Sequence, residues 1–184
     1  MPTISKSLLL DTALGTVKFT VSIKGNDVSN EHIILSTFPV EPKLPSGMSV
    51  KNCNALLIQI RKAANPFSLR YTANLASSIK GTSCTGQGLA AIEWEDSQSI
   101  VVIGTEDEEA LIYRMPWLKT DMFELEETYE PSLLSINIAK AMYPQKMSFH
   151  FIIAENPMPE PKEVSAWFAV DSGHSKILAH ADSK

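Results

Sequence analysis

The sequence predicts an α+β fold with a mainly antiparallel, sandwich-like β-sheet and one or two short helices. About eight short segments have strand character, and turn-forming residues separate them. The regular alternation of strands and helices that marks a doubly wound parallel fold is missing. Hydrophobic residues make up 44% and charged residues 20% of the 184-residue chain, as in ordinary globular proteins. We therefore expect a single globular domain over residues 1–184, with a polar tail at 172–184 that is free to be flexible.

The first third of the chain favours β structure. In GTVKFTVSIKGND (15–27), Val17, Phe19, Val21 and Ile23 alternate with polar residues, which predicts a strand that ends at a turn. EHIILSTF (31–38) predicts a second strand, and the two are expected to form a hairpin. A proline-rich connector follows, because proline lacks the N–H that a sheet ladder needs. NALLIQIRK (54–62) then predicts a buried strand.

The middle third is expected to continue the sheet. PFSLRYTANLASSIKG (66–81) combines strand alternation with later helical spacing, so a strand that breaks into a helical turn is one interpretation. GTSCTGQG (81–88) is typical of a small-residue loop. LAAIEWEDSQSIVVIGT (89–105) predicts a hairpin, and residues 111–113 are expected to add a third strand.

The last third mixes helix and strand signals. EPSLLSINIAKAMYP (130–144) has a proline at each end of the pattern, and its Ala, Lys and Met residues favour a helix. Leu134, Ile136 and Ile138 would equally line one face of a strand, so both alternatives stay open at 131–143. KMSFHFIIAEN (146–156) and VSAWFAVD (164–171) each predict a strand.

Three features of the sequence bear on the cellular compartment of the protein. No apolar run approaches the length that crosses a bilayer, and the first ten residues lack the apolar core of a secretory signal. Cys53 and Cys84 show no disulfide framework and are expected to be free thiols. These features predict a cytoplasmic protein.

Charge is unevenly distributed along the chain. Residues 1–92 hold nine bases and four acids, residues 93–130 hold two bases and twelve acids, and residues 131–184 hold five of each. The middle segment therefore carries a net charge of −10 within a chain whose total is −5. Four consecutive carboxylates repel one another, which is tolerable in solvent but contributes nothing to folding.

This charge predicts a surface that attracts a basic protein, because like charges gathered on one face accelerate association. Aromatic residues between the acids would supply the apolar anchors of an interface. The candidate partner-binding residues are Glu106, Asp107, Glu108, Glu109, Trp117, Asp121, Phe123, Glu124, Glu126, Glu127 and Tyr129. An inhibitor or immunity-type role is the leading hypothesis. DNA and membranes are anionic and are not expected partners. The alternative is a solvated acidic face whose aromatic residues belong to the core.

The sequence gives weaker indications of catalysis, small-ligand binding or metal binding. A small hydrolase that uses Cys84 or His150 is one alternative, and a small-ligand-binding β-sandwich or barrel is another. His150 and Glu155 stand five residues apart on a strand and point to opposite faces. The tail residues His174, His180 and Asp182 lack the tight spacing of zinc ligands. No metal site and no cofactor are therefore predicted.

Overall fold

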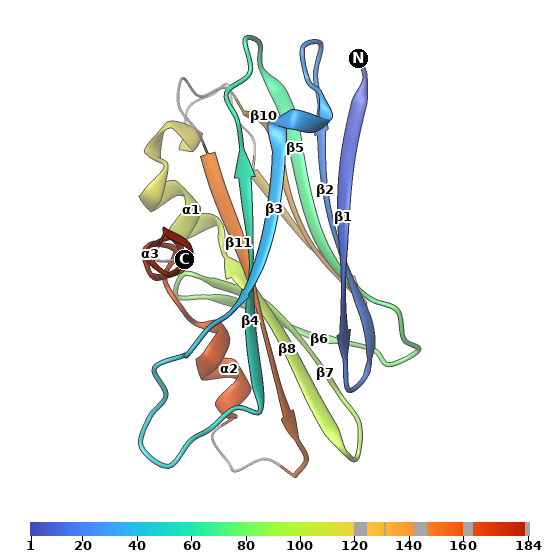
Figure 1. Cartoon of the computed structure of the whole chain (residues 1–184), viewed down its shortest axis with the longest axis vertical. Coiled ribbons are helices and arrows are strands. Elements are labelled where there is room, and N and C mark those ends of the chain that lie inside the picture. The colour runs from blue at the N-terminus through green and yellow to red at the C-terminus, as the bar shows by residue number, and fades with distance from the viewer. Residues whose placement is uncertain (120–124, 131, 142–146, 160–163, 183–184) are drawn as a thin grey trace.

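Figure 1 shows the computed structural model, in which two β-sheets face each other and short α-helices lie on the outer side of one of them. The structure describes residues 1–119, 125–130, 132–141, 147–159 and 164–182. The predicted class is confirmed, because every strand pairing among these residues is antiparallel. Within the described ranges there are three α-helices, where one or two were expected.

Each sheet has a continuous order of strands. Sheet A has the order β1-β2-β5-β10-β9, and sheet B has the order β3-β4-β11-β8-β7-β6. Sheet A contains β1 (Thr3–Thr12), β2 (Gly15–Lys24), β5 (Phe67–Leu75), β9 (Leu125–Glu130) and β10 (Leu133–Ala141). Sheet B contains β3 (Ile33–Pro39), β4 (Asn52–Ile60), β6 (Thr82–Gly86), β7 (Leu89–Glu95), β8 (Ser99–Glu106) and β11 (Met147–Pro157). The α-helices are α1 (Glu108–Arg114), α2 (Ser165–Val170) and α3 (His174–Asp182), and two 3-10 turns cover Asn30–His32 and Pro116–Lys119.

The main core fills the space between the two sheets. The predicted apolar face of β2 is confirmed, since Val17, Phe19, Val21 and Ile23 are all buried. Aromatic rings bridge the sheets: the Phe19 and Phe151 ring centroids lie 5.4 Å apart. Offset and tilted pairs of this kind stabilise beyond the area they bury. Inward residues of β11 thus belong to this core, and its outward residues face the helices.

A second apolar layer lies between sheet B and the helices. Its buried members include Ala55, Leu57, Val102 and Ile152 from the strands and Ala166, Ala169, Val170 and Ile177 from α2 and α3. Gly104 lies where α2 comes closest to β8, because a Cβ at this position would be 2.9 Å from both Cβ and Cγ2 of Val170. The chain therefore has a sheet–sheet–helix arrangement, with one end of the helix layer next to α1 (Figure 1).

The predicted hairpin between residues 15–27 and 31–38 is wrong. β2 pairs with β1 and β5 in sheet A, whereas β3 pairs with β4 in sheet B. β1 was not predicted; its alternating residues Ile4, Leu8 and Leu10 are only partly buried against the core. β1 is an edge strand and its alternation is correspondingly weak.

The helix favoured at residues 131–143 is also wrong in the part that the structure describes. Residues 133–141 form β10, with Leu134, Ile136 and Ile138 fully buried. β10 pairs with β5 on one side and β9 on the other, so tertiary pairing overrides the helix propensity of the Ala and Lys residues. The open alternative of a strand is the correct one.

Four further local expectations need correction. Residues 111–113, expected as a strand, lie in α1, where the Asp107 side chain caps the helix by accepting from Ala110 N. The strand expected at 164–171 is α2, and the loop expected at 81–88 contains β6. The segment 66–81 forms strand β5 without a helical turn.

The described helices are all short. None of them is long and apolar enough to cross a membrane. Cys53 is buried on β4 and Cys84 is exposed on β6, and both are free thiols, as expected.

Candidate functional site

Two neighbouring strands of sheet B carry polar residues where their apolar outward rows end. On β8 the outward row runs through Ile100, Val102 and Gly104 to Glu106, and on β11 it runs back from Ile152 to His150 and Ser148. Ile152 pairs with Gly104, so the next outward positions at this end, His150 and Glu106, lie opposite each other. α1 and α3 supply the remaining polar groups.

Five side chains form what we call the polar cluster: Glu106, Arg114, Ser148, His150 and His174. Arg114 donates to both carboxylate oxygens of Glu106, from Nε at 2.8 Å and from Nη2 at 2.6 Å, and Nη2 also donates to the Ser148 carbonyl at 2.9 Å. His150 Nδ1 and His174 Nδ1 are 2.8 Å apart, and His174 Nε2 lies 2.8 Å from Ser148 Oγ. The cluster thus joins α1, β8, β11 and α3.

The two imidazoles are almost completely buried, each side chain being 2% exposed. Burial is the main cause that lowers the pKa of His150 to about 3; the charge of Arg114 lowers it further, and a hydrogen bond with the Ser172 backbone opposes the shift. Burial also lowers the pKa of His174 to about 3, with Arg114 and His150 adding to the shift and Glu106 opposing it. Both rings are therefore neutral near pH 7.

Neutral imidazoles have one N–H and one lone pair each, which constrains the contacts. Two Nδ1 atoms at hydrogen-bond distance require that one ring donates and the other accepts. If His174 is the donor at Nδ1, its Nε2 accepts from the Ser148 hydroxyl. The cluster can therefore hold a proton at defined atoms, or present nitrogen and oxygen lone pairs to a cation.

The acidic block at 106–109 does not lie on one exposed surface, unlike the expected surface of partner-binding carboxylates. Glu106 is 9% and Asp107 is 4% exposed. Glu106 is bonded to Arg114, and Asp107 accepts from both Ala110 N and Gly88 N. Buried carboxylates need such donors, and these two are used inside the fold.

The rest of the block is exposed. Glu108 and Glu109 lie in the first turn of α1 and face solvent. Trp117 is half-buried and packs against the core between the sheets. The aromatic ring expected beside the acids is thus partly a core residue.

The second acidic group is placed only in part. Asp121, Phe123 and Glu124 lie outside the described residues. Glu126, Glu127 and Tyr129 belong to β9, which forms one edge of sheet A and pairs with β10. α1 contacts β9, so the two acidic segments are neighbours in space.

Cys84 and His150, either of which was a candidate for the hydrolase alternative, are far apart. Cys84 is on β6 and His150 is on β11, with β7 and β8 between them. Three strand spacings correspond to roughly 14 Å. A thiol and its base must be within hydrogen-bond reach, so these two residues do not form a catalytic pair.

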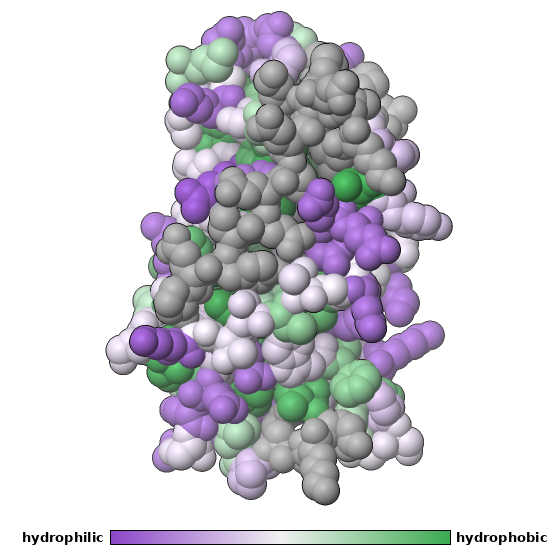
Figure 2. Space-filling view, turned by 180° about the vertical axis from the view of Figure 1, so that it is seen from behind, coloured by the Kyte–Doolittle hydropathy of each residue, from purple (hydrophilic) through white to green (hydrophobic). Residues whose placement is uncertain are grey.

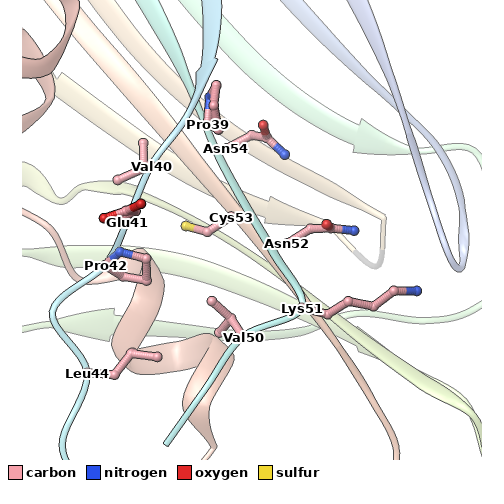
Figure 3. A pocket seen from close by; sticks show the side chains of 10 residues that line it. All are labelled: Pro39, Val40, Glu41, Pro42, Leu44, Val50, Lys51, Asn52, Cys53 and Asn54. Atoms are coloured by element: carbon pink, nitrogen blue, oxygen red, sulfur yellow. The ribbon is translucent and has the colours of Figure 1, made fainter.

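A groove of about 430 Å³ lies between β4 and the chain that follows β3. Figure 3 shows the Cys53 side chain turned toward the segment 40–42, whereas Asn52 and Asn54 turn to the other side of β4. Burial raises the pKa of the Cys53 thiol to about 11. The groove therefore holds a neutral thiol, and the small-ligand alternative stays a prediction.

Two features of the structure were not predicted from the sequence. Tyr113 is 90% exposed on α1, although its position was assigned to a strand. The polar cluster joins residues 106, 114, 148, 150 and 174, which no local spacing connects. A usable signal was present in β11, where Ser148 and His150 continue the outward row that Ile152 and Ala154 make apolar. Compared with known proteins, the chain matches no family model, no curated protein and no solved structure.

Proposed function

We propose that the protein is a cytosolic, non-enzymatic binding module that docks a basic protein, in the manner of an inhibitor or an immunity-type partner. Its docking surface consists of the exposed residues Glu108, Glu109 and Tyr113 of α1 together with the neighbouring strand β9; we call this the α1–β9 surface. The observation that carries the proposal is the contact between α1 and β9, which brings together two acidic segments that are separate in the sequence.

Charge is the first support for this proposal. The segment 93–130 contains twelve acids and two bases, and even without the buried Glu106 and Asp107 it keeps ten acids. One of the two bases, Arg114, is bonded to Glu106 and neutralises a buried carboxylate. The exposed Glu108 and Glu109 of α1, with the acidic residues of β9, would steer a basic partner toward the α1–β9 surface.

Tyr113 is the second support. It is 90% exposed and follows Glu109 by one helical turn, so the two share a face of α1. Tyrosine is enriched among the residues that dominate interface energetics, because it combines a large apolar ring with a polar tip. An exposed tyrosine beside two exposed carboxylates combines an anchor with steering charge.

The edge position of β9 is the third support. An outer strand leaves backbone N–H and C=O groups on its free side, and proteins often place charged residues on such strands to prevent unspecific pairing. On the face that Figure 2 shows, apolar residues appear in small separate areas among hydrophilic ones. Charge and the exposed ring of Tyr113 are the proposed basis of docking at the α1–β9 surface.

A cytosolic location agrees with the two free thiols, one of which is exposed. Exposed thiols persist where the surroundings are reducing.

The experiment is affinity capture from the source cells with the wild-type chain and with the variant Glu108→Lys/Glu109→Lys/Tyr113→Ala. The wild type is expected to retain a strongly basic protein, and the variant to lose most of it. Binding should weaken in high salt, because screening shortens the range of the attraction. With the purified partner, the variant should lower the association rate at least tenfold.

A matched control carries the same change of charge at another place. Glu31→Lys/Glu41→Lys/Leu9→Ala alters two exposed acids and one exposed apolar residue away from α1. This control should bind like the wild type. Equal loss in both variants, or capture that neither variant changes, would contradict the proposal.

A further inference from the structure

We propose that Glu106, His150 and His174 form a binding site for a divalent transition-metal ion of the zinc class. Among the His, Cys, Asp and Glu side chains of the described residues, these three bring one ligand atom each to within 4.8 Å of one another. The site is independent of the α1–β9 surface, because none of its ligands is exposed.

The spacing of the three atoms fits a metal ion. His150 Nδ1 and His174 Nδ1 are 2.8 Å apart, and each is 3.8 Å from Glu106 Oε2. A triangle with these sides has its circumcentre about 2.0 Å from every corner. Zinc bonds to histidine nitrogen and carboxylate oxygen are about 2.0–2.2 Å long, so an ion at this point meets the required bond lengths. Tetrahedral coordination would also require the two Nδ1 atoms to move apart from their present 2.8 Å.

The ligand set selects the class of ion. Two imidazole nitrogens and one carboxylate oxygen suit zinc, iron(II), cobalt(II) and nickel(II), whereas magnesium and calcium require oxygen ligands. Three protein ligands also leave a coordination position for water or another small ligand, which is the pattern of open rather than purely structural zinc sites.

Groups around the ligands hold them in orientation. Arg114 grips both oxygens of Glu106, and Ser148 Oγ lies 2.8 Å from His174 Nε2. Metal-binding histidines usually hydrogen-bond through their second nitrogen, and metal-binding carboxylates are themselves hydrogen-bonded. Glu106 Oε2 has a second lone pair besides the one that accepts from Arg114, so the ion and the guanidinium can share this oxygen.

Metal binding requires a hydrogen to move within one imidazole ring but no net loss of a proton. Without an ion, one of the two Nδ1 atoms carries the hydrogen that joins the rings. Binding needs both Nδ1 lone pairs, so this hydrogen leaves Nδ1 and the ring takes it up again at Nε2. In His174 the new Nε2–H then donates to the Ser148 hydroxyl oxygen, whereas without an ion the hydroxyl donates to Nε2. A rotatable hydroxyl permits this exchange of roles. Both rings stay neutral, and no proton is released overall.

Access passes by Arg114 and α3. The Arg114 side chain is 25% exposed and Ser148 is half-buried, so the cluster reaches solvent beside these two residues. His174 is the first residue of α3 and follows Gly173, around which a Cβ would meet nothing within 4 Å. Displacement of the Arg114 side chain and local opening of the turn at Gly173 would admit an ion, while the buried Ile177 keeps α3 packed on sheet B.

The test is titration of the full chain with Zn²⁺ in the presence of a competing chelator. The wild type is expected to bind one equivalent with saturation, and His174→Gln and His150→Gln to bind at least tenfold more weakly. His32→Gln and His180→Gln replace histidines outside the cluster and should stay within twofold of the wild type. Mg²⁺ in large excess should not compete. Equal binding by all four variants, or no saturable binding by the wild type, would overturn the site.

A second measurement does not depend on whether the variants fold. In the ¹⁵N-labelled wild-type chain, one equivalent of Zn²⁺ should move the imidazole nitrogen resonances of His150 and His174 into the metal-bound range and leave those of His32 and His180 unchanged. Shifts confined to His32 or His180, or no shifts at all, would show that the cluster does not bind the ion.

Discussion

His150 Nδ1 and His174 Nδ1 lie 2.8 Å apart in the interior, with Glu106 Oε2 at 3.8 Å from both. This contact fastens α3, at the end of the chain, to the centre of sheet B. It also keeps two titratable rings where water does not reach them. Several measurable properties follow from it and from the packing around it.

Stability should fall in mild acid. The pKa of each ring is about 3 in the folded chain and near 6.5 when exposed, so below pH 6.5 the unfolded state binds protons that the folded state cannot. Stability is thus complete above pH 6.5 and is lost toward pH 3, by up to about 1.4 kcal/mol per pH unit for each ring. Denaturant unfolding at pH 7.0 and 5.0 measures this. Replacing His174 with Asn should reduce the slope, and an unchanged free energy over this range would show that the rings are not buried.

The ion pair between Glu106 and Arg114 should contribute more to the free energy of unfolding than a pair on the surface. Arg114→Met leaves a largely buried carboxylate without its bidentate partner and is expected to cost at least about 2 kcal/mol. Adding Glu106→Gln removes the unpaired charge and should recover part of that loss, which a double-mutant cycle would reveal. Additive losses would mean that the two side chains do not interact in solution.

Gly104 should be intolerant of a side chain. Gly104→Ala places a Cβ 2.9 Å from Val170 and from Leu89 Cδ1, so α2 must shift and the cost should be about 1–3 kcal/mol. Gly173→Ala is the control, because a Cβ there meets nothing within 4 Å. Thermal unfolding compares the two. Similar melting temperatures for both variants would argue against the close approach of α2 to β8.

The two thiols should differ in reactivity. The pKa of Cys53 is raised to about 11 by burial, so only about 0.1% of it is thiolate at pH 8, while Cys84 is exposed. Brief alkylation at pH 8, followed by peptide mass spectrometry, should label Cys84 and leave Cys53 at least 100-fold less modified. Labelling of Cys53 at a similar rate would show that β4 is open to solvent.

The sequence predicts those parts of this fold that strong alternation defines. The row from Val17 to Ile23 and the hairpin of β7 and β8 have clear patterns, and both are present. Which strands pair with each other is harder to predict from the sequence. β2 and β3, for example, follow each other in the chain but belong to different sheets. Residues 133–141 have helix-forming side chains and become a strand through contacts with β5 and β9.

The polar cluster could not be predicted from local sequence for a similar reason. Its histidines are separated by 24 residues, and Glu106 and Arg114 come from a segment whose charge suggested a wholly exposed surface. Charge density does not distinguish Glu106 and Asp107, which bond inside the fold, from Glu108 and Glu109, which face solvent. The register of β8 against β11 sets Glu106 opposite His150, and the start of α1 makes Asp107 the helix cap and leaves Glu108 and Glu109 in solvent.

The most direct test of the metal site is a crystal structure of the chain grown with one equivalent of Zn²⁺, with data recorded on both sides of the zinc absorption edge. An anomalous peak about 2.0–2.2 Å from His150 Nδ1, His174 Nδ1 and Glu106 Oε2 is the predicted result. An empty cluster with the two imidazoles still hydrogen-bonded to each other, or a zinc peak only at surface residues, would contradict it.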